Sequence, residues 1–336
     1  MRYVAYHGLL LLLFTQCAIS NASRHFKSPL AMGRDAFKPK HASSVSISEV
    51  IDTGVNSNLL RTVGCSRVRA DCFYKGVFIM NYIGIDIGST CAKTVVLNEK
   101  KEFIQEFVQP TGWSSVDTAE EILQKLKLAG INLSDDPSYC VATGYGRISV
   151  PYADKAVTEI TCHALGAVHL FHQPDLTVID IGGQDTKIIQ IEQGFVKDFI
   201  MNDKCAAGTG RFLEVMANTL SLRPNEMFEL ARLGSDTTIS SMCTVFAESE
   251  VIGLIGKGEP KENIAYAVVD STIRKVTAQL SRMNGEMSTF CLTGGLCECE
   301  YIREALSKKL GKEVISSPDA RYAGAIGAAL SAMKIR

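Results

Sequence analysis

The chain has 336 residues, of which 46% are hydrophobic and 21% charged, a composition typical of globular proteins and long enough for about two domains. Its formal net charge of −1 excludes the strongly basic surface that binding to nucleic acid or to an anionic membrane requires. Eleven cysteines in a chain of this length indicate reduced thiols, some of them metal ligands, rather than a disulfide-stapled domain.

Residues 1–79 differ from the rest of the chain. An early arginine, a short apolar run from Leu9 to Phe14 and small residues near Ala18 resemble a signal peptide, and the run is too short to span a bilayer. The sequence from 21 to 78 has no strong periodicity, and Met80 directly precedes a predicted strand. Two interpretations stay open: an exported protein with a long leader, or a protein that truly starts at Met80. No later segment has the length and apolar character of a membrane span.

An internal repeat organises the chain from Met80 onward. Residues 83–97 read IGIDIGSTCAKTVVL and residues 177–191 read TVIDIGGQDTKIIQI. Each copy predicts a hairpin of two apolar strands, with an aspartate beside a glycine turn. Five positions are identical at a constant offset of 94 residues: Ile85 and Ile179, Asp86 and Asp180, Ile87 and Ile181, Gly88 and Gly182, Lys93 and Lys187.

Further elements alternate between helix and strand. A helix is predicted to begin at Asp117 and to end at Gly130. The remaining predicted elements are a strand running into the glycine turn at 143–147, a strand at 194–202, helices at 211–222, 224–233, 260–283 and 297–310, a strand at 289–293, and a closing helix at 317–333. The pattern predicts an α/β protein with two duplicated halves, 80–175 and 176–336, and a last helix that packs back on the first half.

The glycine turns predict a site for a nucleoside triphosphate with Mg²⁺. Glycine turns direct backbone N–H groups at phosphate oxygens, and carboxylates complete the shell of Mg²⁺, usually through water. Gly294 and Gly295, after a strand, suit ribose or a phosphate. Lys93 either contacts a phosphate or is a surface lysine. The phosphate turns are assigned to Gly88, Ser89, Thr90, Gly182 and Gly183, with Asp86 and Asp180 facing the metal.

These motifs resemble those of a known superfamily. In the order GIDIGST, VIDIGGQD and LTGGL they are similar to the phosphate and adenosine motifs of actin, sugar kinases and heat-shock chaperone ATPases. Within that superfamily, NDKCAAGTGRFLEVMA and SSMCTVFAESEVI resemble the activator ATPases of 2-hydroxyacyl-CoA dehydratases and the related ATPase subunits of benzoyl-CoA reductase. ATGYGR and EITCHALGA match as well, so the resemblance covers residues 80–336.

The resemblance implies an actin-like (ribonuclease H-like) ATPase fold with the nucleotide in an interdomain cleft. It implies a homodimer with one [4Fe–4S] cluster between its subunits, and ATP hydrolysis that drives a low-potential electron into a partner dehydratase. Cys205 and Cys243 match the ligand positions. A ferredoxin or flavodoxin is the implied electron donor, and the implied compartment is the cytoplasm, which favours a start at Met80. Gly208, Thr209 and Gly210 form a glycine turn at a predicted helix start, which suggests a phosphate, and they are assigned to the nucleotide site as well.

A ligand count agrees with a shared cluster. A [4Fe–4S] cluster takes four thiolates, each chain offers two matched cysteines, and a two-fold dimer doubles them. Both cysteines stand before predicted helices, where the helix dipole favours a thiolate. Cys297 and Cys299 form a Cys-x-Cys pair that is an alternative, though a helix start with spare thiols explains them as well.

Other assignments and functions stay open. Gln184 and Asp185 are predicted to position the attacking water, and His163 is predicted to be a packed helix histidine. The alternative functions are the ATPase subunit of a benzoyl-CoA-type reductase, a small-metabolite kinase, and a filament or scaffold ATPase. The kinase would need an acceptor pocket, and neither it nor the scaffold would need Cys205 and Cys243.

Overall fold

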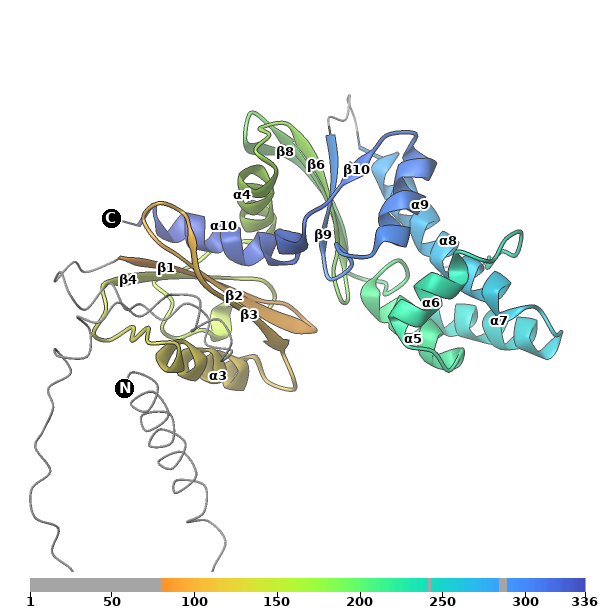
Figure 1. The fold of residues 1–336 in the computed structure, drawn as a ribbon, viewed down its shortest axis with the longest axis horizontal. Helices are drawn as coiled ribbons and strands as arrows, with labels where there is room; N and C mark the ends of the chain where they lie inside the picture. Colours follow the sequence, from red (N-terminus) through yellow and green to blue (C-terminus); the bar gives the residue numbers. More distant parts are fainter. Residues whose placement is uncertain (1–79, 241–242, 284–288, 336) are drawn as a thin grey trace, which may run out of the picture. The chain divides into compact units, whose positions relative to one another are not determined.

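The computed structural model describes residues 80–240, 243–283 and 289–335, so the predictions for residues 1–79 lie outside the described part of the chain. The first sheet has the strand order β3-β2-β1-β4-β5. Strands β1, β2 and β3 are antiparallel neighbours, and β4 and β5 run parallel to β1 (Figure 1). Its strands are β1 (Asn81–Ile87), β2 (Cys91–Leu97), β3 (Phe103–Pro110), β4 (Ser138–Thr143) and β5 (Lys155–Ala156).

The second sheet repeats this topology. Read as β8-β7-β6-β9-β10, it has the same sequence of antiparallel and parallel neighbours. Asp86 lies opposite Lys93 across the first hairpin, and Asp180 lies opposite Lys187 across the second, so the predicted hairpin repeat is confirmed. The strands are β6 (Leu176–Ile181), β7 (Thr186–Glu192), β8 (Phe195–Asn202), β9 (Thr289–Gly294) and β10 (Val314–Ile315).

Two helices pack against each other, and each also packs against one of the two sheets. Helix α4 (Glu159–Phe171) packs against the second sheet, where Ala164 and Ala167 join a core with strands β6 and β7. Helix α10 (Ala323–Ala332) packs against the first sheet beside Val95 and Leu97. A side chain at Gly84 of β1 would collide with the carbonyl oxygen of Ala325, so a glycine is needed for the helix to approach the strand this closely (Figure 1).

Other helices cover the outer faces of the sheets. Alternate residues of a strand point to opposite faces, and Ile83, Ile85 and Ile87 of β1 pack on the side of α3 (Ser115–Leu128). Ile179 and Ile181 of β6 belong to a larger core shared with five described helices of the second half. These helices are α5 (Gly210–Thr219), α6 (Pro224–Ala231), α7 (Thr244–Gly256), α8 (Lys261–Leu280) and α9 (Glu300–Leu310).

The presence of a helix was predicted more accurately than the residue at which it begins. Helix α3 is capped by Ser114, whose hydroxyl accepts from the N–H of Asp117 at 3.2 Å, so the predicted cap at Asp117 is wrong. A serine has the short hydroxyl that an N-cap needs, and Asp117 then stands in the first turn, where the helix dipole favours a carboxylate. No described helix is both long and apolar enough to cross a membrane.

Candidate active site and cysteine loops

The two hairpin turns have the same geometry. The N–H of Gly88 donates to the carbonyl of Cys91 at 3.1 Å, and the N–H of Gly182 donates to that of Asp185 at 2.9 Å. The turns also lie against each other, because a side chain on Gly183 would collide with Thr90 Oγ1. The structure therefore brings the two predicted phosphate turns together from different sheets.

Asp86 and Asp180 are the penultimate residues of strands β1 and β6 and are both buried, at 5% and 2% exposure. A glycine with positive φ stands at the end of the neighbouring parallel strand in each half: Gly144 directly follows β4 at +83°, and Gly294 is the last residue of β9 at +84°. Neither position has room for a side chain: a Cβ on Gly294 would lie 2.7 Å from Asp180 Oδ1, and a Cβ on Gly144 would collide with Asp86 Oδ1. The repeat thus extends beyond the hairpins to the strand ends that border each carboxylate.

Lys187 is a buried cation that faces three carboxylates. Its Nζ lies 2.8 Å from Asp185 Oδ2, 3.3 Å from Asp180 Oδ2 and 3.8 Å from Glu159 Oε2. Burial alone would lower the pKa of Lys187, but the three carboxylates outweigh burial and raise that pKa well above its usual range. Lys187 is therefore charged at neutral pH.

The pKa of Asp180 is shifted in the opposite direction from that of Lys187, downward. Burial alone would raise its pKa, but His163 and Lys187, with the Thr293 hydroxyl that donates to Asp180 Oδ1 at 2.9 Å, hold the pKa well below its usual range. Burial raises the pKa of Glu159, at the edge of the same cluster. The second turn thus keeps Asp180 ionised although its side chain is buried.

His163 of α4 lies between the two aspartates. It is buried, as a packed helix histidine would be, but its Nε2 is 4.0 Å from Asp86 Oδ2 and its Nδ1 is 3.6 Å from Asp180 Oδ1. Sequence reasoning missed this contact, and it also missed Glu159 and Lys187 as members of the site. One signal was available, because Glu159 and His163 are four residues apart and so share a helix face.

The remaining predicted site residues are distributed around the turns. Gln184 is exposed, and Asp185 is half-buried in its ion pair with Lys187. Lys93 is half-buried, with its Nζ 4.0 Å from Asp86 Oδ2, so it is not a plain surface lysine. Gly295 is exposed, with open space around its Cα.

The loop that carries Cys205 is bonded to the second phosphate turn. Asn202 Nδ2 donates to the carbonyls of Cys205 and Ala207 at 2.9 and 3.2 Å. At the end of the loop the N–H groups of Gly210 and Arg211 donate to the carbonyls of Gly182 and Gly183 at 2.9 and 2.8 Å, respectively. The first N–H groups of α5 therefore bind the turn itself, and the loop and the turn form one hydrogen-bonded unit.

Two further hydrogen bonds involve the loop residues that were predicted to contact the nucleotide. Thr186 Oγ1 donates to the carbonyl of Gly208 at 2.7 Å, and Thr209 Oγ1 donates to the carbonyl of Ala206 at 2.6 Å. Gly208 has φ +84°, a conformation that favours glycine. These contacts shape the loop, and a phosphate contact by Gly208, Thr209 or Gly210 stays a prediction.

Cys243 is the N-cap residue of α7 and is exposed, whereas Cys205 is half-buried. Helix α7 is joined to α5 by the Thr219 hydroxyl, which donates to Glu248 Oε1 at 3.3 Å. Glu250 accepts from the N–H of Ser240 at 3.0 Å, a contact between α7 and a residue three positions before the cysteine. Glu248 and Glu250 therefore have structural contacts in the region of Cys243.

Comparison with known proteins decides the family. Residues 83–332 match the model of the BadF/BadG/BcrA/BcrD ATPase family. The chain belongs to this family. It is 43% identical over 255 residues to the (R)-2-hydroxyglutaryl-CoA dehydratase activating ATPase of Acidaminococcus fermentans, covering 75% of this chain and 96% of that protein. The resemblance stated from the motifs is confirmed.

Two solved structures confirm the actin-like fold. The component A structure of the Acidaminococcus fermentans (R)-2-hydroxyglutaryl-CoA dehydratase aligns with TM-score 0.70 at 42% identity, covering 76% of this chain and 98% of that one. The activator of the 2-hydroxyisocaproyl-CoA dehydratase from Clostridium difficile, with bound ADPNP, aligns with TM-score 0.69 at 34% identity, covering 76% and 95%.

Among the other described thiols, Cys162, Cys297 and Cys299 are poorly suited to ligation. A metal ligand must be a thiolate. Burial raises the pKa of the Cys162 thiol to about 11, and it also raises the pKa values of Cys297 and Cys299. In the described parts of the chain no three histidine, cysteine or acidic side chains are grouped so that they could hold a metal ion.

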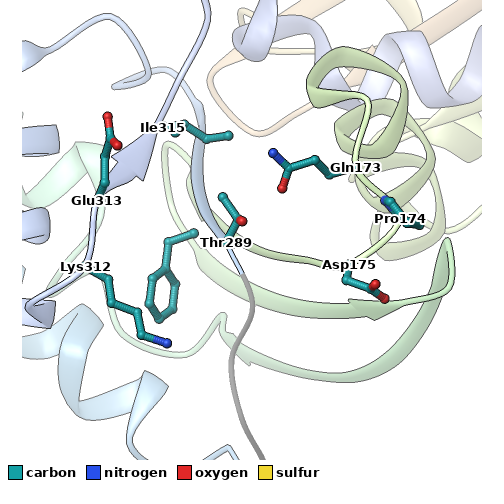
Figure 2. Close-up of a pocket in the computed structure, with 8 residues that line it drawn as sticks. Gln173, Pro174, Asp175, Thr289, Lys312, Glu313 and Ile315 are labelled. Atoms are coloured by element: carbon teal, nitrogen blue, oxygen red, sulfur yellow. The ribbon is translucent and has the colours of Figure 1, made fainter.

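A cavity of about 640 Å³ lies away from all of these residues (Figure 2). It is lined by Asp175 and Thr289, at the starts of β6 and β9, together with Lys312, whose ammonium lies 6.0 Å from the centre of the Phe290 ring. Asp180 and Gly294 stand at the opposite ends of those strands. The cavity is therefore separate from the phosphate turns.

Proposed function

We propose that this protein is an ATP-dependent activator of a 2-hydroxyacyl-CoA dehydratase, which couples ATP hydrolysis to electron delivery through a [4Fe–4S] cluster shared by two copies of the chain. One observation carries the proposal. The loop of Cys205 is hydrogen-bonded to the second phosphate turn through the N–H groups of Gly210 and Arg211. A change at the phosphates therefore reaches the cysteine through backbone bonds. The family and the named activities of its relatives support the same function.

The nucleotide site is formed by the facing turns. Backbone N–H groups of Ser89, Thr90 and Gly183 bind the phosphates, and Gly294–Gly295 receives the adenosine end. The predicted N–H donors of Gly88 and Gly182 are excluded, because they already donate within the turns. Asp86 and Asp180 hold water in the shell of Mg²⁺, and Asp180 suits this role because its pKa lies well below its usual range. Gln184, which is exposed beside the turn, orients the attacking water together with Asp185.

Cys205 and Cys243 would hold the cluster, two thiolates from each subunit. The described residues fit this donor set, since both cysteines precede helices and are less buried than Cys140, Cys162 and Cys291. Partial positive charge at a helix N-terminus favours a thiolate over a thiol. When bound, the cluster would supply the low-potential electron, with a ferredoxin or flavodoxin as the donor and the dehydratase as the acceptor.

Helix α7 offers a surface for the second copy. Ala247 and Val251 are fully buried on one side of the helix. The other side exposes four apolar side chains, Val245 (68%), Phe246 (68%), Ile252 (57%) and Ile255 (46%). A helix that is apolar on both sides and exposed on one of them is typical of an interface. This surface begins beside Cys243, so a dimer formed here brings the cysteines of two chains together.

Iron analysis of the anaerobically purified protein tests the proposal. A four-iron cluster shared by two chains gives about two irons per chain. Cys205→Ser and Cys243→Ser should lose most of the iron and all electron delivery to a dehydratase, while ATP binding persists because the turns are unchanged. Cys297→Ser and Cys299→Ser are the matched controls and should keep the cluster. About four irons on a monomeric protein would contradict the shared site and implicate the Cys297–Cys299 pair.

A kinetic comparison separates this function from that of a metabolite kinase. The proposed activator hydrolyses ATP without a phosphate acceptor, and its activity belongs in the cytoplasm, where ATP and reduced thiols occur together. Transfer of phosphate to a small alcohol, with iron-free protein fully active, would favour the kinase. A colourless preparation made under strict exclusion of oxygen would point the same way.

A further inference from the structure

Helices α4 and α10 cross at two close contacts, each between a glycine of one helix and a backbone carbonyl of the other. The two contacts are related by a local two-fold symmetry. A side chain on Gly327 of α10 would collide with the carbonyl of Cys162 on α4, and a side chain on Gly166 of α4 would collide with the carbonyl of Ala323 on α10. Cys162 thus corresponds to Ala323 and Gly166 corresponds to Gly327, both at an offset of 161 residues. The repeat of the sheets therefore continues into the helices between them.

The same offset pairs His163 with Gly324, and here the symmetry is broken. A Cβ on Gly324 would lie 2.6 Å from Asp86 Oδ2 and 2.9 Å from His163 Nε2. Because residue 324 has no side chain, the imidazole of His163 and the carboxylate of Asp86 have room beside it. One ring therefore serves both halves, where two symmetric side chains would not fit.

The ring faces one aspartate with each of its nitrogens. Nε2 lies 4.0 Å from Asp86 Oδ2, and Nδ1 lies 3.6 Å from Asp180 Oδ1. The side chain is 8% exposed, and Nδ1 has no hydrogen-bond partner among the described residues. A buried nitrogen without a partner is costly, so a short movement of Asp180 toward the ring would be favourable.

We propose that His163 is a positioning residue that couples the two phosphate-turn aspartates, so that the orientation of either carboxylate depends on the other. Asp86 and Asp180 belong to different sheets, and the rigid ring of His163 lies within 4.0 Å of both carboxylates. Lys93 also pairs with Asp86 and helps to lower the pKa of Asp180, but its side chain is long and flexible. If one carboxylate reorients when the site is occupied, the ring would move with it and change its distance to the second carboxylate. The inference rests on the proposed role of these aspartates in the Mg–ATP site.

Amide replacements can separate the two contacts. The amide of His163→Asn lies near the place of Nδ1 and keeps the link to Asp180, while the longer His163→Gln places its amide near Nε2 and keeps the link to Asp86. His163→Leu keeps the bulk and loses both links. His169→Gln, on the same helix and only partly buried, is the control. Each variant is made in the full chain, and its thermal unfolding is recorded first.

Steady-state ATP hydrolysis at varied ATP and Mg²⁺ is the measurement. His163→Leu should lower kcat by about tenfold or more, with KM for ATP changed less than about threefold and a higher Mg²⁺ requirement. In double-mutant cycles, His163→Gln should retain coupling only to Asp86→Asn, and His163→Asn only to Asp180→Asn. A merely structural histidine would instead give parallel losses in all variants and a lower unfolding temperature without this pattern.

The single aspartate variants separate the two hypotheses. If Asp86→Asn and Asp180→Asn hydrolyse ATP normally, the proposed nucleotide site is wrong. If both are impaired while His163→Leu keeps kcat within about twofold of the parent protein, the site is right and the coupling role of His163 is overturned. Loss of coupling to both aspartates in both amide variants, at unchanged kcat, would overturn it as well.

Discussion

Removing the buried ammonium of Lys187 should strongly destabilise the fold. Lys187→Met keeps the apolar stem and leaves Asp180, Asp185 and Glu159 without their shared cation. The side chains of Lys187 and Asp180 are only 4% and 3% exposed, and their charged atoms are 3.3 Å apart. At an effective dielectric constant of about 20, a pair at this distance contributes about 5 kcal/mol of attraction, most of which desolvation offsets.

The expected loss of folding stability follows from the carboxylate charge that is left buried and unpaired. Breaking a buried ion pair by deleting one partner costs about 3–5 kcal/mol, or about 6–20 °C in the unfolding temperature of a domain of this size. Thermal and urea unfolding of the cluster-free protein at neutral pH measure this loss of stability. Lys197→Met, on the adjacent strand β8, is the matched control, since Lys197 and Glu192 are 47% and 55% exposed and their pair contributes about 1 kcal/mol or less.

The pH dependence gives a second test. The pKa of Asp180 is lower in the folded than in the unfolded chain, so its stabilising contribution is present above the unfolded pKa of about 3.9 and is lost as pH falls through the folded value. In Lys187→Met the folded pKa of Asp180 rises, so the stability gap to the parent protein should narrow as the pH is lowered from 7 toward 4. A free energy of unfolding within about 1 kcal/mol of the parent at pH 7 would refute this reasoning.

The remaining predictions concern activity and assembly. A protein starting at Met80 should hydrolyse ATP like the full chain, and an insoluble or inactive short form would contradict the Met80 start. Asp86→Ala and Asp180→Ala should each lower ATPase turnover by about tenfold or more, or roughly 1.4 kcal/mol of barrier, with ATP binding affected less; normal turnover would remove them from the site. Phe246→Glu should weaken dimerisation by about tenfold or more in sedimentation, and a dimer of unchanged affinity would place the interface elsewhere. Protease digestion should differ between the ATP and ADP states at the loop of Cys205, whereas identical patterns would argue against coupling between the turn and the loop.

The parts of the fold that were predictable depend on local patterns. An aspartate, a glycine turn and alternating β-branched residues specify a hairpin within fifteen residues or so, and two copies reveal the duplication. The order of the strands follows from the hairpins and from the parallel strands that come after each helix. The helix boundaries were less predictable, because Ser114 and Asp117 are both good N-terminal residues and only the backbone conformation decides between them.

The cluster of charged residues could not be predicted, because distant segments form it. Glu159 belongs to α4, whereas Asp180, Asp185 and Lys187 belong to a hairpin that follows it, and their proximity depends on how α4 lies across the second sheet. His163 was predicted to be packed, and it is. Nothing in its own helix indicated that two carboxylates from different sheets face its ring.

The broken symmetry at 163 and 324 limits how the two halves can be exchanged. A chimera built from two copies of the first half would place a second imidazole where a Cβ is already 2.6 Å from Asp86 Oδ2. A chimera built from two copies of the second half would leave two carboxylates facing each other across an empty space. The two halves are therefore not interchangeable at this crossing, and each requires a partner that is different from itself.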